Sequence, residues 1–176
     1  MKSSLCALVS LVSLVGAAGS SRFTPARPPA LPLAVKSPYM STWQDAGSDN
    51  GNGGYLAGRW PTFWSDQITG WSGMIRVDGD TYLWMGGIPD SQAVDQVAYE
   101  YTSTRSIFTM HVAGKVEMNI TFLSPVTPND FKRQSIISSY LDVDVASIDG
   151  GRHSVQLYSD ISAGKLSVNH GRAKVN

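Results

Sequence analysis

Cysteine is nearly absent from this sequence: the 176 residues contain one, Cys6. It lies in an apolar N-terminal run that we expect to be removed, so the mature chain has no thiol. That excludes a disulfide framework, a cysteine nucleophile and a cysteine-ligated zinc. A domain of this size must then be held together by its core, and 42% hydrophobic residues are enough to form one.

An excess of charge of either sign is also missing, because 14 basic residues balance 14 acidic ones. This balance argues against nucleic acid as the main partner and against binding to an acidic membrane surface. Catalytic signatures are lacking too. There is no Gly-x-Ser-x-Gly motif, and His111, His153 and His170 lack the spacing of metal ligands. We therefore predict neither a metal nor a cofactor.

The first 19 residues have the order of features found in a secretory signal peptide. Lys2 supplies a positive charge, residues 5–15 form an apolar run, and residues 16–19 are small. The apolar run is too short to span a membrane. The sequence therefore predicts a signal peptide over residues 1–19 and a secreted, extracellular protein.

Composition divides the rest of the chain into three parts. Residues 20–38 hold five prolines and predict an extended entry segment, which could lie across a sheet edge or link the domain to the signal peptide. Residues 39–163 are predicted to be a β-sandwich domain, which we expect to be incomplete. Residues 164–176 turn basic, with no acidic or aromatic side chain. We interpret them as an atypical tail, either an ordinary basic terminus or translated intron sequence.

Short segments of strand character, joined by turn signals, follow one another between residues 68 and 161. In residues 116–122 apolar and polar side chains alternate strictly, as they do in a half-buried strand. Asp78-Gly79 is a strong signal for a type I′ hairpin. Further strands are expected at residues 68–77, 81–85, 97–103, 107–112, 141–145 and 155–161. No segment has a long helical period, so the predicted fold is all-β, an antiparallel β-sandwich.

All five tryptophans lie in the first half of the predicted domain. They could form a carbohydrate-binding surface if exposed, or core and domain interface if buried. We favour the second interpretation, because tryptophan is highly buried on average. These residues are Trp43, Trp60, Trp64, Trp71 and Trp84.

Polar residues offer a few further candidates. Asn119-Ile120-Thr121 matches the acceptor motif for N-glycosylation, so we predict a glycan on Asn119. Asp142 and Asp144 share one face of a predicted strand, either as a carboxylate pair for acid–base chemistry or, more commonly, as a solvated face. The Asp78-Gly79-Asp80 turn and the glycine-rich loop at residues 51–54 are interpreted as turns rather than as a cation and a phosphate site.

A series of motifs in one order makes the chain similar to a known family. It resembles the secreted fungal glutaminase A family over nearly all of residues 23–163. The motifs are PLAVKSPY at 32–39, STW at 41–43, WPTFW at 60–64, ITGW at 68–71, IRVDG at 75–79, YEYTSTRS at 99–106, TFLSP at 121–125, YLDV at 140–143 and VQLY at 155–158.

The resemblance implies hydrolysis of L-glutamine to L-glutamate and ammonia outside the cell. It also implies an N-terminal β-sandwich that packs against a larger catalytic domain, a helical barrel, in the same polypeptide. That domain is missing here, so the catalytic residues are expected downstream and the chain alone is expected to be inactive. A small amide is the implied substrate of the full protein. Two alternatives stay open: a stand-alone carbohydrate- or cell-wall-binding module, and a small hydrolase using Asp142 and Asp144.

Overall fold

The computed structural model describes residues 28–47 and 53–162. The predicted signal peptide, the first part of the proline-rich segment, Gly51, Asn52 and the basic tail lie outside these ranges. Within them the chain forms strands and one short helix. The elements are β1 (Ala30–Ser37), β2 (Met40–Asp45), β3 (Thr62–Phe63), β4 (Trp71–Val77), β5 (Asp80–Met85), β6 (Asp95–Tyr101), β7 (Arg105–Val112), β8 (Val116–Leu123), α1 (Phe131–Gln134), β9 (Tyr140–Ser147) and β10 (Val155–Ile161).

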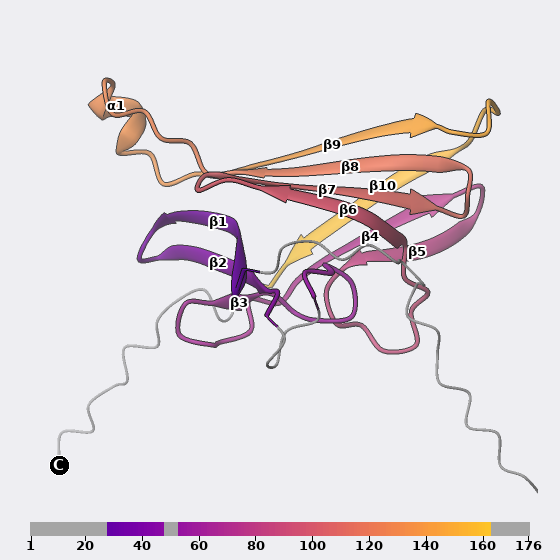
Figure 1. Ribbon diagram of the computed structural model, residues 1–176, viewed down its shortest axis with the longest axis horizontal. Coiled ribbons are helices and arrows are strands. Elements are labelled where there is room, and N and C mark those ends of the chain that lie inside the picture. The colour runs from indigo at the N-terminus through magenta and orange to yellow at the C-terminus, as the bar shows by residue number, and fades with distance from the viewer. Residues whose placement is uncertain (1–27, 48–52, 163–176) are drawn as a thin grey trace, which may run out of the picture.

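The strands form two layers, which confirms the prediction of an all-β, sandwich-like fold with antiparallel sheets. One layer is a four-stranded sheet in the order β6-β7-β8-β9. The other layer consists of two smaller sheets, β1-β2-β3 and β10-β4-β5, which lie below it in Figure 1. The chain passes from the upper sheet to the lower one between β9 and β10.

Local sequence signals explain several of these elements. Asp78 and Gly79 both have positive φ, 52° and 103°, and form the two-residue turn between β4 and β5 that the sequence predicts. The alternation in residues 116–122 of β8 is confirmed, since the apolar residues there are buried and the polar residues half-buried. Those apolar residues are Val116, Met118, Ile120 and Phe122.

The core lies between the layers and draws side chains from both. Phe122 on β8 meets Trp71 on β4 edge-on, with ring centroids 5.3 Å apart, and meets Phe108 on β7 at 5.9 Å. The proline-rich segment contributes as well. Its described part includes β1, whose Leu31 and Leu33 are fully buried. Pro32 stands between them where the register with β2 shifts, so its missing amide is tolerated.

The side of the sandwich at β5 and β6 is closed by the chain itself. Leu83 on β5 donates its amide to Gln92 O at 2.7 Å and accepts from the Val94 amide at 3.0 Å. These bonds place residues 92–94 along the edge of β5. Leu56, from a preceding loop, is fully buried there and accepts a hydrogen bond from the Gly86 amide. The edge of β5 and the adjoining core are therefore covered.

Candidate functional site

The five tryptophans do not form one surface. Trp84 is fully buried, and its ring lies against Gly73 of the neighbouring strand. Trp71 is partly buried against the core, and its Nε1 donates to Ser159 Oγ at 3.1 Å. The ring of Trp60 lies beside Gly86 and Gly87, which have no side chains to occupy that space. These three tryptophans therefore pack within the domain.

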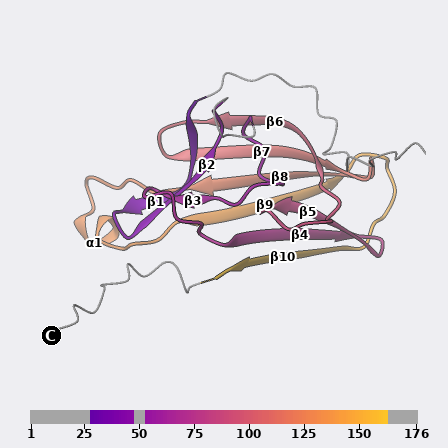
Figure 2. The same ribbon diagram turned by 90° about the horizontal axis from the view of Figure 1, so that it is seen from below.

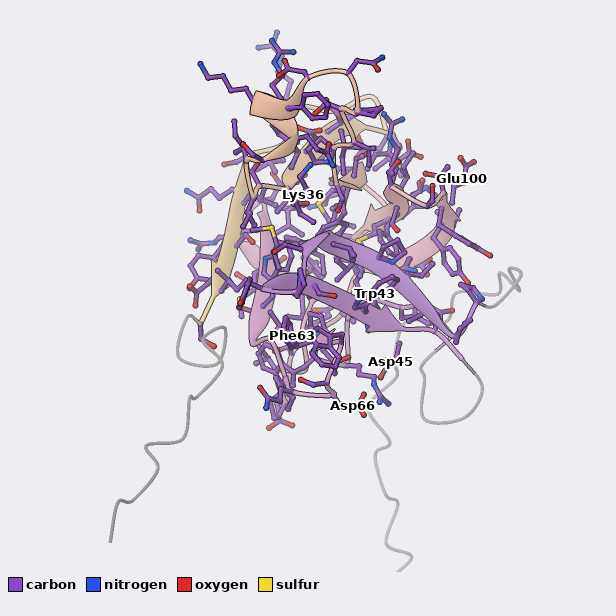
Figure 3. All side chains as sticks on the ribbon, turned by 90° about the vertical axis from the view of Figure 1, so that its left-hand side faces the viewer. Lys36, Trp43, Asp45, Phe63, Asp66 and Glu100 are labelled. Atoms are coloured by element: carbon purple, nitrogen blue, oxygen red, sulfur yellow. The ribbon has the colours of Figure 1, made fainter. Side chains whose placement is uncertain are left out.

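Of the other two tryptophans, Trp43 lies on β2 and Trp64 lies in the turn directly after β3. Trp43 is half-buried on β2 and donates from Nε1 to Ser41 Oγ at 3.0 Å (Figure 3). Trp64 is 63% exposed and donates from Nε1 to the carbonyl oxygen of Pro38, next to the exposed Tyr39. Tyr39 and Trp64 are thus the only strongly exposed candidates for stacking among the described aromatic residues of the β1-β2-β3 sheet and its turns.

Asn119 lies on the outward face of β8, in the middle of the four-stranded sheet. Its Oδ1 accepts from Thr109 Oγ1 at 2.8 Å and its Nδ2 donates to Glu117 at 3.2 Å. Directly across the ladder it pairs with Asp144, and Thr121 pairs with Asp142. Both aspartates are exposed. The predicted glycosylation site and the predicted carboxylate pair therefore share one face, so a glycan on Asn119 would stand beside both carboxylates.

A cluster of charged residues joins three connections at the end of the sandwich. Asp78, in the β4–β5 turn, accepts from Lys115 Nζ at 2.8 Å and from the Ser154 amide at 3.0 Å. His153 lies between two carboxylates, with Nδ1 2.8 Å from Asp78 Oδ2 and Nε2 2.8 Å from Asp149 Oδ1. The cluster fastens the β9–β10 connection to the β4–β5 and β7–β8 turns.

The contacts in this cluster shift the pKa of each group in the direction that favours its charged form: the carboxyl values are lowered, and the lysine and histidine values are raised. Hydrogen bonds, first from Lys115 and then from His153, hold the pKa of Asp78 well below its usual range. Those from His153 and the Gly151 amide lower the pKa of Asp149 to about 2. Asp149 first, and then Asp78, raise the pKa of His153, and Asp78 raises that of Lys115. Of these residues, sequence reasoning considered Asp78, as part of a turn, and His153, which lacked the spacing of a metal ligand.

The described residues contain no cluster of three or more histidine, aspartate, glutamate or cysteine side chains suited to a metal ion. A polar hollow of about 410 Å³ lies beside the charged cluster, lined by Arg76, Asp78, Gly79, Ser154 and Gln156. No helix within the described ranges is long and apolar enough to cross a membrane.

Sequence reasoning did not locate an exposed apolar edge, which lies at β9 and β10. Paired residues show which side chains face the core: Val155 and Leu157 lie opposite the buried Val77 and Ile75. Val145 on β9 likewise lies opposite the buried Met118. Yet Val145, Val155, Leu157 and Ile161 are between 37% and 46% exposed. We call these four residues the open edge.

A second exposed apolar feature is the connection between β8 and β9, residues 124–139, here called the α1 arm. It projects beyond the end of the four-stranded sheet (Figure 1). Phe131 is 85% exposed, and α1 has no buried residue. Lys36 lies beneath the arm (Figure 3) and donates from Nζ to Pro125 O at 2.6 Å. The other exposed apolar residues of the arm are Val126, Ile136 and Ile137.

Comparison with known proteins shows that the sequence of this chain is similar to those of glutaminases. The chain is 65% identical over 156 residues to glutaminase A of Aspergillus oryzae, which covers 89% of this chain but 22% of that protein. It is 33% identical over 175 residues to a probable glutaminase of Arthroderma benhamiae, covering 90% of this chain and 19% of that protein. A family model described as a domain of unknown function, DUF5127, matches residues 104–176. No solved structure matches the chain.

The chain thus spans about a fifth of the length of the curated relatives that it matches. The resemblance to the glutaminase A family that the sequence motifs predict is confirmed by the 65% identity.

Proposed function

We propose that this chain is the N-terminal domain of a secreted glutaminase, a protein that hydrolyses L-glutamine to L-glutamate and ammonia. The observation that carries the proposal is the 65% identity to glutaminase A across 89% of the chain. In this proposal the domain packs against a catalytic helical-barrel domain of the same polypeptide. It supports that domain and does not itself carry the reacting groups.

The exposed apolar surfaces support a docking role. The α1 arm holds Phe131 and its apolar neighbours away from the core, and each of these side chains is more than half exposed. Contiguous apolar surface on a protein generally marks an interaction site. An adjoining domain that covered the arm would remove this surface from water.

Secretion and glycosylation are part of the same proposal. The signal peptide predicted over residues 1–19 would direct the chain to the secretory pathway. Asn119 and Thr121 both lie on the outward face of β8, where an attached glycan would point into solvent. This position leaves the α1 arm and the open edge free of the glycan.

A chimera tests the proposal. The segment of Aspergillus oryzae glutaminase A that matches this chain is replaced by the corresponding residues of this chain, and ammonia release from L-glutamine is measured. We expect the chimera to be active within about tenfold of the parent, and the 176-residue chain alone to be inactive. A chimera that is secreted and folded but inactive, or an isolated chain that releases ammonia, would contradict the proposal.

A second candidate, a carbohydrate-binding module, is favoured by one observation. Tyr39 and Trp64 are strongly exposed in turns of the β1-β2-β3 sheet, and Trp64 is bonded to the backbone beside Tyr39. Aromatic faces of this kind can stack on sugars. If they do so here, the chain will sediment with insoluble cell-wall glucan or chitin, and Trp64→Ala will release it. Sedimentation that does not differ between the chain and this variant would eliminate the candidate.

A further inference from the structure

The two long sides of the sandwich differ. On the side of β5 and β6, residues 92–94 bond to the edge of β5, and Leu56 seals the adjoining core. On the side of β9 and β10, the described residues supply no such cover. On the covered side, a backbone segment bonds to the strand edge and an apolar side chain lies over the core. We take these two features as what covers a side of this sandwich.

The upper sheet, whose edge strand on this side is β9, does not extend far enough sideways to cover β10 of the lower sheet. Figure 2 shows β10 as the outermost strand of the lower layer, displaced past β9 toward the edge of the molecule. Every residue of β10 is exposed, including those that face the core side of the lower sheet. A strand placed next to β9, in the plane of the upper sheet, would lie over the inward side of β10.

The edge of β9 is suited to accept such a strand. Its eight residues pair with β8 in an unbroken register from Tyr140 to Ser147, so the ladder is regular. In an antiparallel pair, alternate backbone groups point away from the partner strand and remain free on an edge. Natural edges are commonly blocked by proline, lysine or a bulge. β9 contains none of these, whereas β6, at the other edge of the sheet, carries an irregularity at Gln96 and Ala98.

We infer that the sandwich is completed by a further strand that pairs with β9 and covers the open edge, and that this strand belongs to the continuing polypeptide. The inference rests on the proposed function. The relatives supply the length of chain, because the matched segment is about a fifth of each. The added strand would present apolar side chains at every second position to Val145, Val155, Leu157 and Ile161.

The surroundings of β9 and β10 indicate which side chains the added strand carries. Its inward side chains meet the aliphatic residues of the open edge, with Ser159 between Leu157 and Ile161, so they are mainly apolar. Its outward side chains adjoin Asp142 and Asp144, which are exposed on the outward face of β9. Basic or hydroxyl residues are favoured at those outward positions, because like charges directly opposite each other on a sheet are destabilising.

Hydrogen–deuterium exchange tests the inference on the 176-residue chain and on the glutaminase A chimera described above. In the chimera, we expect alternate amides of β9, those directed away from β8, to exchange at least about tenfold more slowly than in the shorter chain. Equal exchange of these amides in the two proteins would overturn the inference. A stable dimer of the shorter chain with the same amides protected would also overturn it, since the occupant would then be a second copy.

A pair of substitutions provides an independent readout. Leu157→Lys puts a charge at the open edge, and Gln156→Lys puts the same charge on the opposite, outward face of β10. We expect Leu157→Lys to lower the Tm of the chimera by about 5 °C or more and to leave the shorter chain nearly unchanged. Gln156→Lys should have little effect on either. Equal sensitivity of both proteins to Leu157→Lys would mean that the shorter chain already covers this position.

The two proposals can fail separately. A chimera that releases ammonia while its β9 amides stay unprotected leaves the glutaminase function intact and refutes the added strand. A chimera with protected β9 amides that is folded but inactive supports the strand and contradicts the function.

Discussion

Gly73 is the position at which a single methyl group should disturb the core most clearly. It lies on β4 opposite an irregularity in β5, where Gly73 pairs with Met85 and Met74 with Leu83, so that Trp84 is the extra residue. The indole of Trp84 fills the space that a side chain at position 73 would occupy. A Cβ there would lie 2.1 Å from Trp84 Cε2 and 2.2 Å from Cζ2.

The expected magnitude follows from that geometry. Carbon atoms in contact prefer separations of about 3.5–4.0 Å, so the ring must move by roughly 1.5 Å in Gly73→Ala. Trp84 is fully buried, which leaves it no free space to enter. Overpacking of this kind costs about 1–3 kcal/mol, which corresponds to a fall in Tm of roughly 2–12 °C for a domain of this size.

Thermal unfolding of the 176-residue chain, followed by near-UV circular dichroism, measures this effect. Gly47→Ala is the matched control, because the added Cβ would meet Pro29 at an ordinary 3.7 Å and the φ of Gly47 is not positive. In the background of Trp84→Phe, where the ring is smaller, Gly73→Ala should cost less. A fall in Tm from Gly73→Ala no larger than that from Gly47→Ala would show that Trp84 does not restrict this position. A cost of Gly73→Ala that is undiminished beside Trp84→Phe would show the same.

Three further outcomes are expected. The pKa of His153 is raised in the folded state, so its stabilising contribution is complete below about pH 6.5 and is lost as pH rises through the raised value. The urea midpoint of the wild type should therefore fall as pH rises through this range, and that of His153→Gln should not. If the midpoints of the two proteins depend on pH in the same way, this prediction is wrong. Phe122→Ala removes a fully buried ring in contact with Trp71 and should lower the free energy of unfolding by about 3–5 kcal/mol. Urea denaturation measures this loss, and a value below about 1 kcal/mol would be incompatible with the place of Phe122 in the core. Asn119→Gln should increase the electrophoretic mobility of the secreted chain as much as endoglycosidase treatment does, and unchanged mobility would show that Asn119 carries no glycan.

Short-range patterns in the sequence predicted much of the fold because the interactions behind them are local. Alternation in residues 116–122 determines which side chains of β8 face the core, and two consecutive residues able to adopt positive φ form the turn at Asp78 and Gly79. For the proline-rich segment the same reasoning predicted an extended entry that could lie across a sheet edge. The described part of this segment holds the edge strand β1, but the burial of Leu31 and Leu33 in the core was not predicted.

The charged cluster around His153 depends on contacts between residues far apart in the sequence. His153 and Asp78 are separated by 75 positions, and neither pattern nor composition indicates that they meet. The open edge was equally hidden, because Val155 and Leu157 alternate as core residues do, and only the relative position of the two sheets leaves them uncovered.

The sequence by itself therefore determined the all-β class, the hairpin at Asp78 and Gly79, and the similarity to glutaminase A, since each rests on residues that are neighbours or on motifs in a fixed order. Tertiary structure alone decided which tryptophans are buried, which charged groups pair, and which side of the sandwich stays open. These properties arise from how sheets stack, and side chains on different sheets come into contact only once the chain has folded.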